Sequence, residues 1–220
     1  MQYVLIYQTF GRDMIKAILY DLDGVLVDAT EWHYESLNNA LQEVVGFIIN
    51  RDEHIETFNG IPTITKMEIL NKQGRLSKDK FDIVWEKKQE KTFEVIEKTA
   101  SIDSNKIRLH QNTKNLKKVC VTNSIRKSAL LMLEKTGQLP FMDFVISNED
   151  VSSPKPSPEG YKIAIEKLNL IPKECMIVED APKGIEAAHQ SSANVYEVSG
   201  YNEVTLENIL AKINYFNLKS

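Results

Sequence analysis

Apolar residues are spaced in two different ways along this chain. Residues 15–20 form a short apolar run interrupted only by Lys16, which is typical of a buried strand in a parallel sheet. Residues 29–100 contain no strand-like run, and their apolar side chains recur instead at helical spacing. Helices are predicted there at residues 31–45, 61–73 and 78–99, with Ser77 as a candidate N-cap.

Strand and helix patterns alternate again from Lys117 onward. The predicted strands cover residues 117–122, 143–147, 175–179 and 193–198, and the predicted helices cover residues 158–168, 183–191 and 206–215. Strands that alternate with helices favour right-handed crossovers and a parallel sheet with helices on both faces. The predicted fold class is therefore α/β, with a Rossmann-like parallel-sheet core of residues 1–28 and 101–220 and an inserted α-helical cap of residues 29–100.

Composition narrows the possible partners. The chain has 220 residues, of which 42% are hydrophobic and 26% charged, and its formal net charge is −4. No broad basic field is present, so we expect neither nucleic acid nor a membrane surface as a partner. Cys120 and Cys175 lie in apolar runs and are predicted to be small core residues rather than a disulfide.

Residues 1–13 lack the basic region and the long apolar core of a secretory signal, and their apolar run is too short to span a membrane. We therefore expect a cytoplasmic protein, and we expect a monomer. These thirteen residues are either an upstream start or an additional edge strand of the core.

The predicted strand at residues 15–20 ends in the sequence Asp21-Leu-Asp23-Gly24. Two carboxylates and a glycine at that position are suited to a ligand, because ligands of open α/β sheets bind at the carboxyl ends of the strands. Aspartate and glycine are also common turn formers, so this segment alone is equally compatible with a simple strand cap.

Three further polar segments follow predicted strands. They are Thr122-Asn123-Ser124, Lys155 within Ser-Pro-Lys-Pro-Ser-Pro, and Glu179-Asp180 before Ala-Pro-Lys-Gly. The four segments, in this order, resemble the motifs of the haloacid dehalogenase superfamily of aspartate-nucleophile phosphohydrolases. The helical insert resembles the cap of its branch that contains β-phosphoglucomutase and phosphoglycolate phosphatase.

The position at the strand end and the resemblance both assign Asp21 as the nucleophile, since a carboxylate can form an aspartyl-phosphate. Asp23 points the same way along the chain and is the predicted general acid and base. The second aspartate is typically absent from the dehalogenases of the superfamily, so its presence favours phosphate esters.

A nucleophilic carboxylate and an anionic substrate repel each other, so a hard cation is expected between them. The predicted Mg²⁺ ligands are the carboxylates of Asp21 and Asp180, the main-chain carbonyl of Asp23, and Glu179 directly or through water. The alternative for Glu179 and Asp180 is a pair of acids on the surface.

The remaining core predictions concern the phosphate. Thr122 and Gly24 are predicted to bind phosphate oxygens, and Asn123 the phosphate or the edge of the substrate, although Thr122 or Ser124 as a plain helix N-cap is equally compatible. Lys155, held between two prolines, is predicted to stabilise the transferring charge.

In the cap, His33 and Lys88 occupy positions where relatives place substrate-facing residues. The alternatives are that His33 orients the hinge and that Lys88 belongs to a solvated helix face. Residues 59–62 resemble a cap loop that reaches over the site in relatives. Residues 102–116 contain neither proline nor glycine and, compared with relatives, predict an abbreviated connection from cap to core without a full helix.

The predicted function is a Mg²⁺-dependent hydrolase of a small phosphorylated metabolite. A sugar-phosphate mutase of the β-phosphoglucomutase type is the first alternative, although Ile125 and Arg126 stand where mutases tend to have lysine and asparagine. A catalytically inactive binding protein on the same fold is the second alternative, which the intact acids and lysine disfavour.

Overall fold

The computed structural model describes residues 14–58 and 61–219. A five-stranded parallel sheet in the order β3-β2-β1-β4-β5 organises this part of the chain. Its strands are β1 (Ala17–Tyr20), β2 (Lys117–Val121), β3 (Phe144–Ile146), β4 (Cys175–Glu179) and β5 (Asn194–Glu197). The strand that precedes the two aspartates is therefore central, and it begins two residues later than the apolar run predicted.

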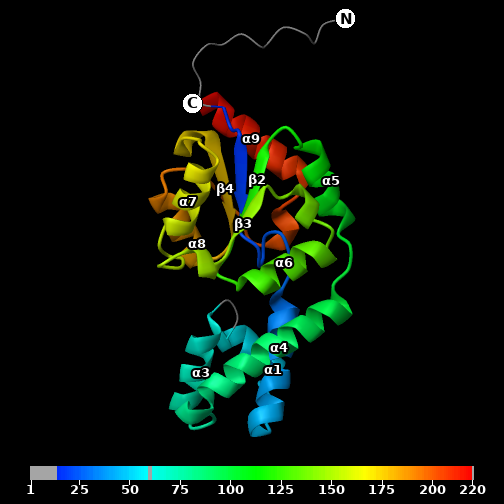
Figure 1. The fold of residues 1–220 in the computed structure, drawn as a ribbon, viewed down its shortest axis with the longest axis vertical. Coiled ribbons are helices and arrows are strands. Elements are labelled where there is room, and N and C mark those ends of the chain that lie inside the picture. The colour runs from blue at the N-terminus through cyan, green and yellow to red at the C-terminus, as the bar shows by residue number, and fades with distance from the viewer. Residues whose placement is uncertain (1–13, 59–60, 220) are drawn as a thin grey trace, which may run out of the picture.

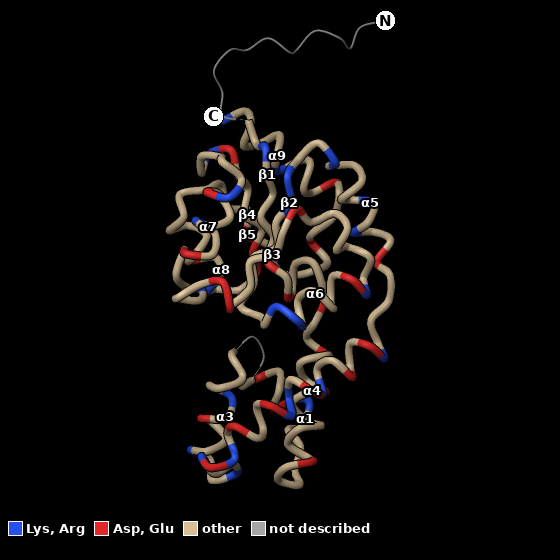
Figure 2. The backbone as a smooth tube through the Cα atoms, viewed as in Figure 1, with Lys and Arg blue, Asp and Glu red and all other residues tan. Residues whose placement is uncertain are grey.

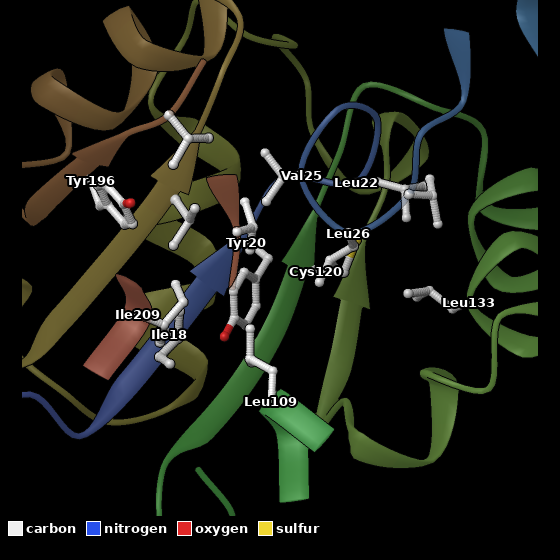
Figure 3. Packing of buried hydrophobic residues seen from close by; sticks show 14 of the residues in the cluster. Ile18, Tyr20, Leu22, Val25, Leu26, Leu109, Cys120, Leu133, Tyr196 and Ile209 are labelled. Carbon is white, nitrogen blue, oxygen red and sulfur yellow. The ribbon is translucent and has the colours of Figure 1, made fainter. Parts of the chain in front are cut away.

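Helices cover both faces of the sheet, as the alternation of patterns predicted. On one face lie α5 (Ser104–Asn112), α6 (Arg126–Lys135) and α9 (Leu206–Lys219), and on the other lie α7 (Glu159–Lys167) and α8 (Pro182–Gln190) (Figure 1). Side chains of β1 alternate between the two faces, with Ile18 and Tyr20 packed among the first set of helices and Leu19 among the second. Figure 3 shows the first of these clusters closing around Tyr20.

Residues 30–58 and 61–99, between β1 and α5, form helices joined by short loops and make a separate body on the carboxyl side of the sheet (Figure 1). Its elements are α1 (Thr30–Val45), α2 (Arg51–Glu53), a π-helix (His54–Phe58), α3 (Thr63–Lys72), a 3₁₀ turn (Lys78–Lys80) and α4 (Phe81–Thr99). A third apolar cluster, which includes Leu37, Leu41, Met67 and Val84, holds these helices together. The helical insert is confirmed. Ser77 has the extended backbone of an N-cap, but its side chain makes no capping hydrogen bond.

The prediction of an abbreviated connection at residues 102–116 was wrong, because α5 occupies nine of these residues. Asp103 caps the helix by accepting hydrogen bonds from the backbone N–H groups of Asn105 and Lys106, each at 3.0 Å. Leu109 buries its side chain in the cluster around Tyr20 (Figure 3). An aspartate cap and one apolar anchor thus form the helix without proline or glycine.

Residues 1–13 and 59–60 lie outside the described residues, and with them lie the predicted N-terminal extension and part of the predicted cap loop at residues 59–62. In the described part of the chain, no helix is both long and apolar enough to cross a membrane. Basic and acidic residues are interspersed over the core and the helical insert alike (Figure 2).

Candidate active site

The carboxyl ends of three strands bring the predicted catalytic residues to one edge of the sheet. Asp21 follows β1, Thr122 follows β2, and Glu179 is the last residue of β4. This edge faces the helical insert (Figure 1). Lys155 reaches the same edge from the loop between β3 and α7, so the sheet gathers segments that lie far apart in the sequence.

Lys155 is the cation at the centre of this site. Its Nζ donates hydrogen bonds to Asp21 Oδ1 at 2.6 Å, to Glu179 Oε1 at 2.6 Å and to the Val121 carbonyl at 2.7 Å. Burial lowers the pKa of this ammonium group, but the charges of Asp21 and Glu179 outweigh burial and raise its pKa above the ordinary value. Lys155 therefore stays charged beside the predicted nucleophile.

Asp21, Glu179 and Asp180 form an acidic cluster whose ligand atoms lie within 4.8 Å of one another. Burial, followed by the charge of Glu179, raises the pKa of Asp21 well above its usual range although Lys155 opposes the shift. Burial and the charge of Glu179 also raise the pKa of Asp180, to about 6. One lysine does not compensate three carboxylates held this closely.

Two carboxylate oxygens of this cluster are unpaired in the described part of the chain. Glu179 Oε2 and Asp180 Oδ1 are buried and have no hydrogen-bond partner among the described residues. Buried polar atoms are normally paired, and unpaired carboxylate oxygens next to each other fit a hard cation that prefers oxygen ligands. The donor set therefore fits a divalent metal such as Mg²⁺.

Two glycines let the backbone approach these carboxylates. Gly24 has a positive φ of 82°, and a Cβ there would lie 2.1 Å from Asp180 Oδ2. At Gly184, in α8, a Cβ would lie 2.0 Å from Glu179 Oε1. Each position leaves no room for a side chain, so both glycines shape the acidic cluster.

Asp23 has a different environment from Asp21. Its Oδ1 is hydrogen-bonded to His33 Nε2 at 2.8 Å, and its Oδ2 accepts from the Ser124 hydroxyl at 2.8 Å. Burial raises the pKa of Asp23, but the charge of His33 and the two hydrogen bonds outweigh burial and lower it. One side-chain oxygen is thus bonded to the helical insert and the other to the core.

The segment after β2 supports its neighbours. The Thr122 hydroxyl is buried and accepts a hydrogen bond from Ser124 N at 3.0 Å. The Asn123 side chain accepts from Lys155 N at 3.0 Å and donates to Lys155 O at 3.3 Å. Asn123 therefore fixes the backbone that carries Lys155, the predicted catalytic lysine, and its own contact with a substrate stays a prediction.

Lys88 comes from α4 and is only 7% exposed, so it is not part of a solvated helix face. Burial lowers its pKa, and the charge of Asp23 opposes that shift. His33, from α1, contacts Asp23 directly. Both residues predicted from the insert are therefore electrostatic neighbours of Asp23.

Two residues of the site were not predicted in these roles. Tyr161, in α7, donates its hydroxyl hydrogen bond to Glu179 Oε1, and Ser124 binds Asp23. Tyr161 follows Lys155 on the next helix, but nothing in its sequence context distinguishes it from a core tyrosine. For Ser124, the hydroxyl directly after Thr122-Asn123 was the available signal.

Known proteins resemble this chain over most of its length. Residues 18–198 match the family model of the haloacid dehalogenase-like hydrolases. A phosphorylated carbohydrates phosphatase of Thermotoga maritima is 26% identical over 191 residues, which is 84% of this chain and 85% of the relative. The pyrophosphatase PpaX of Bacillus pumilus is 25% identical over 178 residues, which is 77% of this chain and 76% of that protein.

Solved structures share the fold. A β-phosphoglucomutase of Clostridium difficile superposes with a TM-score of 0.72 and 25% identity, over 93% of this chain and 100% of that one. A protein from Haemophilus somnus described as a predicted phosphoglycolate phosphatase gives a TM-score of 0.76 at 20% identity, over 90% and 97% of the two chains. The family match spans most of the chain and includes every strand-end segment of the site, so this chain belongs to the haloacid dehalogenase-like hydrolases.

Proposed function

We propose that this chain is a Mg²⁺-dependent phosphomonoester hydrolase that acts on a small phosphorylated metabolite through an aspartyl-phosphate on Asp21. The names of its phosphatase relatives support this reaction class. The observation that carries the proposal is the contrast between two aspartates. Asp21 belongs to the acidic cluster and is bonded to Lys155, whereas Asp23 is bonded to His33 and Ser124.

Asp21, Asp180 and the main-chain carbonyl of Asp23 would hold the metal, with Glu179 as a ligand directly or through water. When bound, a divalent cation would neutralise charge on the phosphoryl oxygens and lower the pKa of Asp21, which keeps the nucleophile ionised. The open oxygens of Glu179 and Asp180 support this assignment.

The first step transfers the phosphoryl group to the protein. An oxygen of Asp21 forms a bond to phosphorus as the bond from phosphorus to the alcohol oxygen breaks, and Asp23 donates a proton to that oxygen. The pKa of Asp23 is lowered in the free protein, but an arriving phosphate dianion raises it again because like charges disfavour ionisation. Lys155 neutralises the developing charge, and Thr122 holds a phosphate oxygen.

The second step returns Asp21 to its starting form. Asp23, now a carboxylate, accepts a proton from a water molecule that attacks the phosphorus, and the acyl-phosphate bond breaks. The helical cap of residues 29–100 covers the core of residues 1–28 and 101–220, excludes bulk water during the first step, and selects the alcohol portion of the substrate. Because one chain supplies both parts, we propose that it works as a monomer.

The test is phosphate release from a panel of phosphorylated metabolites, with wild type beside Asp21→Asn. We expect release with Mg²⁺, none after chelation, and none from the variant, which keeps the shape of the side chain and lacks the nucleophile. Release that persists in Asp21→Asn would overturn the assignment of the nucleophile.

A sugar-phosphate mutase is the second candidate, favoured by the structural similarity to a β-phosphoglucomutase. A mutase would convert β-glucose 1-phosphate to glucose 6-phosphate without releasing phosphate. Arg126, at the start of α6, pairs with Asp150 rather than with the acidic cluster, and Lys127 lies over the Phe93 ring of α4. Neither basic group after Ser124 is thus engaged with the acidic cluster. We therefore place the hydrolase first.

A further inference from the structure

Three basic side chains are buried inside the helical cap. His54 lies in the π-helix, Lys66 in α3 and Lys88 in α4, and their exposed fractions are 2%, 6% and 7%. Lysine is almost never fully buried without a partner, because transferring its charge from water costs free energy. Two buried lysines in one small cap therefore call for a function.

No hydrogen bond or ion pair engages the Nζ of Lys66 or of Lys88 within the described residues. Burial and then the charge of Lys88 lower the pKa of Lys66 to about 8, and no carboxylate opposes that shift. Burial and then the charge of Lys66 lower the pKa of His54. The charge of Lys88 thus disfavours the charged form of Lys66, and the charge of Lys66 disfavours that of His54.

Other buried lysines of the chain are used differently. Lys106 donates to the carbonyls of Tyr201 and Val204, and Lys118 donates to the carbonyls of Thr113 and Leu116. Those ammonium groups hold the core together. Lys66 and Lys88 have no comparable structural bond, so a packing role does not account for them.

Lys88 is the member of this cluster nearest to the strand ends, because it lies close enough to Asp23 for their opposite charges to attract each other. Lys88 in turn acts on Lys66, and Lys66 on His54. The cluster therefore extends from the general acid into the cap, on the side where the alcohol portion of a phosphomonoester would lie.

We propose that His54, Lys66 and Lys88 bind a second anionic group of the substrate, so that the substrate is a small phosphomonoester that also carries a carboxylate or a second phosphate. This proposal rests on the proposed hydrolase function. The incoming anion supplies the charge that the cap lacks, and charge-assisted hydrogen bonds to it replace the missing partners of both lysines.

The test compares three substrate series of equal chain length, at saturating Mg²⁺. They are ω-phosphoryloxyalkanoates, alkanediol bisphosphates and ω-hydroxyalkyl phosphates, which carry a carboxylate, a phosphate and a neutral group at the far end. We expect at least one anionic series to exceed the neutral series in kcat/KM by about tenfold or more. Whichever anionic series is favoured identifies the second anion.

Lys66→Met carries the decisive comparison. It should lower kcat/KM for the anionic series and remove most of their preference over the neutral series, whose far end carries no charge for Lys66 to bind. Lys72→Met is the matched control, since Lys72 lies on the same helix and is exposed. Equal losses in all three series from Lys66→Met would overturn the proposal, as would equal kcat/KM values for all series in wild type.

A binding measurement separates this proposal from the hydrolase function. In Asp21→Asn, calorimetric titration with an alkanediol bisphosphate and with its hydroxyalkyl phosphate should show tighter binding of the bisphosphate, and Lys66→Met should abolish the difference. If the bisphosphate binds more tightly in this way but no series is turned over, the hydrolase function is wrong and the anion site is supported. Turnover of the neutral series, with no preference for either anionic series in turnover or in binding, would support the hydrolase function and overturn the anion site.

Discussion

Asp23 has the side-chain surroundings of an acid that works only when substrate is present. Its carboxylate is held by His33 and Ser124, and its lowered pKa keeps it ionised in the free protein. Protonation of a leaving alkoxide is needed most when the alcohol is a weak acid. The importance of Asp23 should therefore depend on the leaving group.

Asp23→Asn should lower kcat for alkyl phosphates by about 10²–10⁴-fold, the usual size of a general-acid contribution. The loss should be much smaller for p-nitrophenyl phosphate, whose leaving group needs no proton. Steady-state kinetics with both substrates measure the ratio, and Ser124→Ala, which removes one hydrogen bond and keeps the acid, is the control. Equal losses for both substrates would contradict a general-acid role.

Lys155 compensates the buried charges of Asp21 and Glu179. Without it, Asp21 and Glu179 would remain buried with no compensating charge, a loss that costs about 3–5 kcal/mol when one partner of a buried ion pair is removed. Lys155→Met should lower the free energy of unfolding by about that amount at pH 7 in urea titrations without metal. Lys173→Met, at an exposed lysine, should change it little.

The deficit of Lys155→Met should shrink at lower pH. Removing the cation raises the pKa of Asp21 further above its unfolded value, so the folded state of the variant takes up protons more readily than the unfolded state as pH falls. Uptake of protons by the folded state raises its stability. A stability deficit of Lys155→Met that stays constant between pH 7 and pH 5 would show that Lys155 does not lower the pKa of Asp21.

Among the elements, helix α8 sets the room available to Glu179. Gly184 is buried in this helix, and alanine there would place its Cβ 2.0 Å from the Glu179 carboxylate. Helix propensity alone favours alanine over glycine by about 1 kcal/mol. The clash acts in the opposite direction, because a buried carboxylate bonded to Lys155 and Tyr161 cannot move aside without losing those bonds.

Gly184→Ala should therefore destabilise the protein by about 1–3 kcal/mol, in the range of overpacked core positions, and reduce activity. Thermal unfolding and phosphate release measure the two effects. Lys183→Ala, at the exposed neighbouring position of the same helix, shows the effect of helix propensity without the clash. An increase in stability for Gly184→Ala would mean that the Glu179 side chain can adopt another position that avoids the clash.

Helix α5 carries a buried histidine. His110 has no exposed surface, and its Nε2 lies 3.1 Å from Gln138 Oε1. Burial, only partly offset by Gln138, lowers its pKa from 6.5 to about 4. Between these two pH values the unfolded chain binds a proton that the folded chain does not, so stability falls as pH is lowered through this window.

Wild type should therefore lose up to about 1.4 kcal/mol per pH unit more than His110→Gln between pH 6.5 and 4.5. Urea unfolding of both proteins at several pH values gives the difference, which removes contributions from Asp21 and Asp180 that the two proteins share. His189→Gln alters an exposed histidine and should follow wild type. Parallel curves for wild type and His110→Gln would contradict the lowered pKa.

The elements also show what the sequence could and could not predict. Asp21, Thr122 and Glu179 were predictable as neighbours, since the ends of parallel strands meet at one edge whatever the loops do. The bonds from Ser124 to Asp23 and from Asn123 to Lys155 were not, because they join segments more than thirty residues apart through loop geometry that no periodicity records. Helix α5 was missed because its apolar anchors are few and its start depends on one capping aspartate.

At the scale of the whole molecule, two chain segments join the cap to the core. One of them contains helix α4, which packs in the cap at one end and in the core at the other. Val84 packs in the apolar cluster of the cap, whereas Ile96 packs in the core cluster around Tyr20. Contacts between α4 and α6 continue that connection: Lys127 lies over the Phe93 ring at 4.3 Å, and Lys135 pairs with Glu97. The cap thus has its own small core, and α4 runs as one continuous helix from that core into the larger one.

A cavity placed in the cap should consequently loosen the cap first. Met67→Ala deletes a fully buried side chain of the cap cluster, a change that costs about 2–5 kcal/mol. Because the cap cluster is small, we expect its unfolding to precede that of the core, so that fluorescence of Trp85 in α4 changes at lower urea than far-ultraviolet circular dichroism. A Trp32→Phe background leaves Trp85 as the single tryptophan of the chain.

Met132→Ala, the matched change in the core cluster, should keep the two probes coincident, since loss of the core removes the support for α4. Coincident transitions in Met67→Ala would instead mean that α4 couples both clusters into one cooperative unit. In that case the helical cap and the edge of the sheet that carries Asp21 would gain and lose stability together, and a substrate bound at Asp21 would stabilise Leu37 and Val84 as strongly as the core.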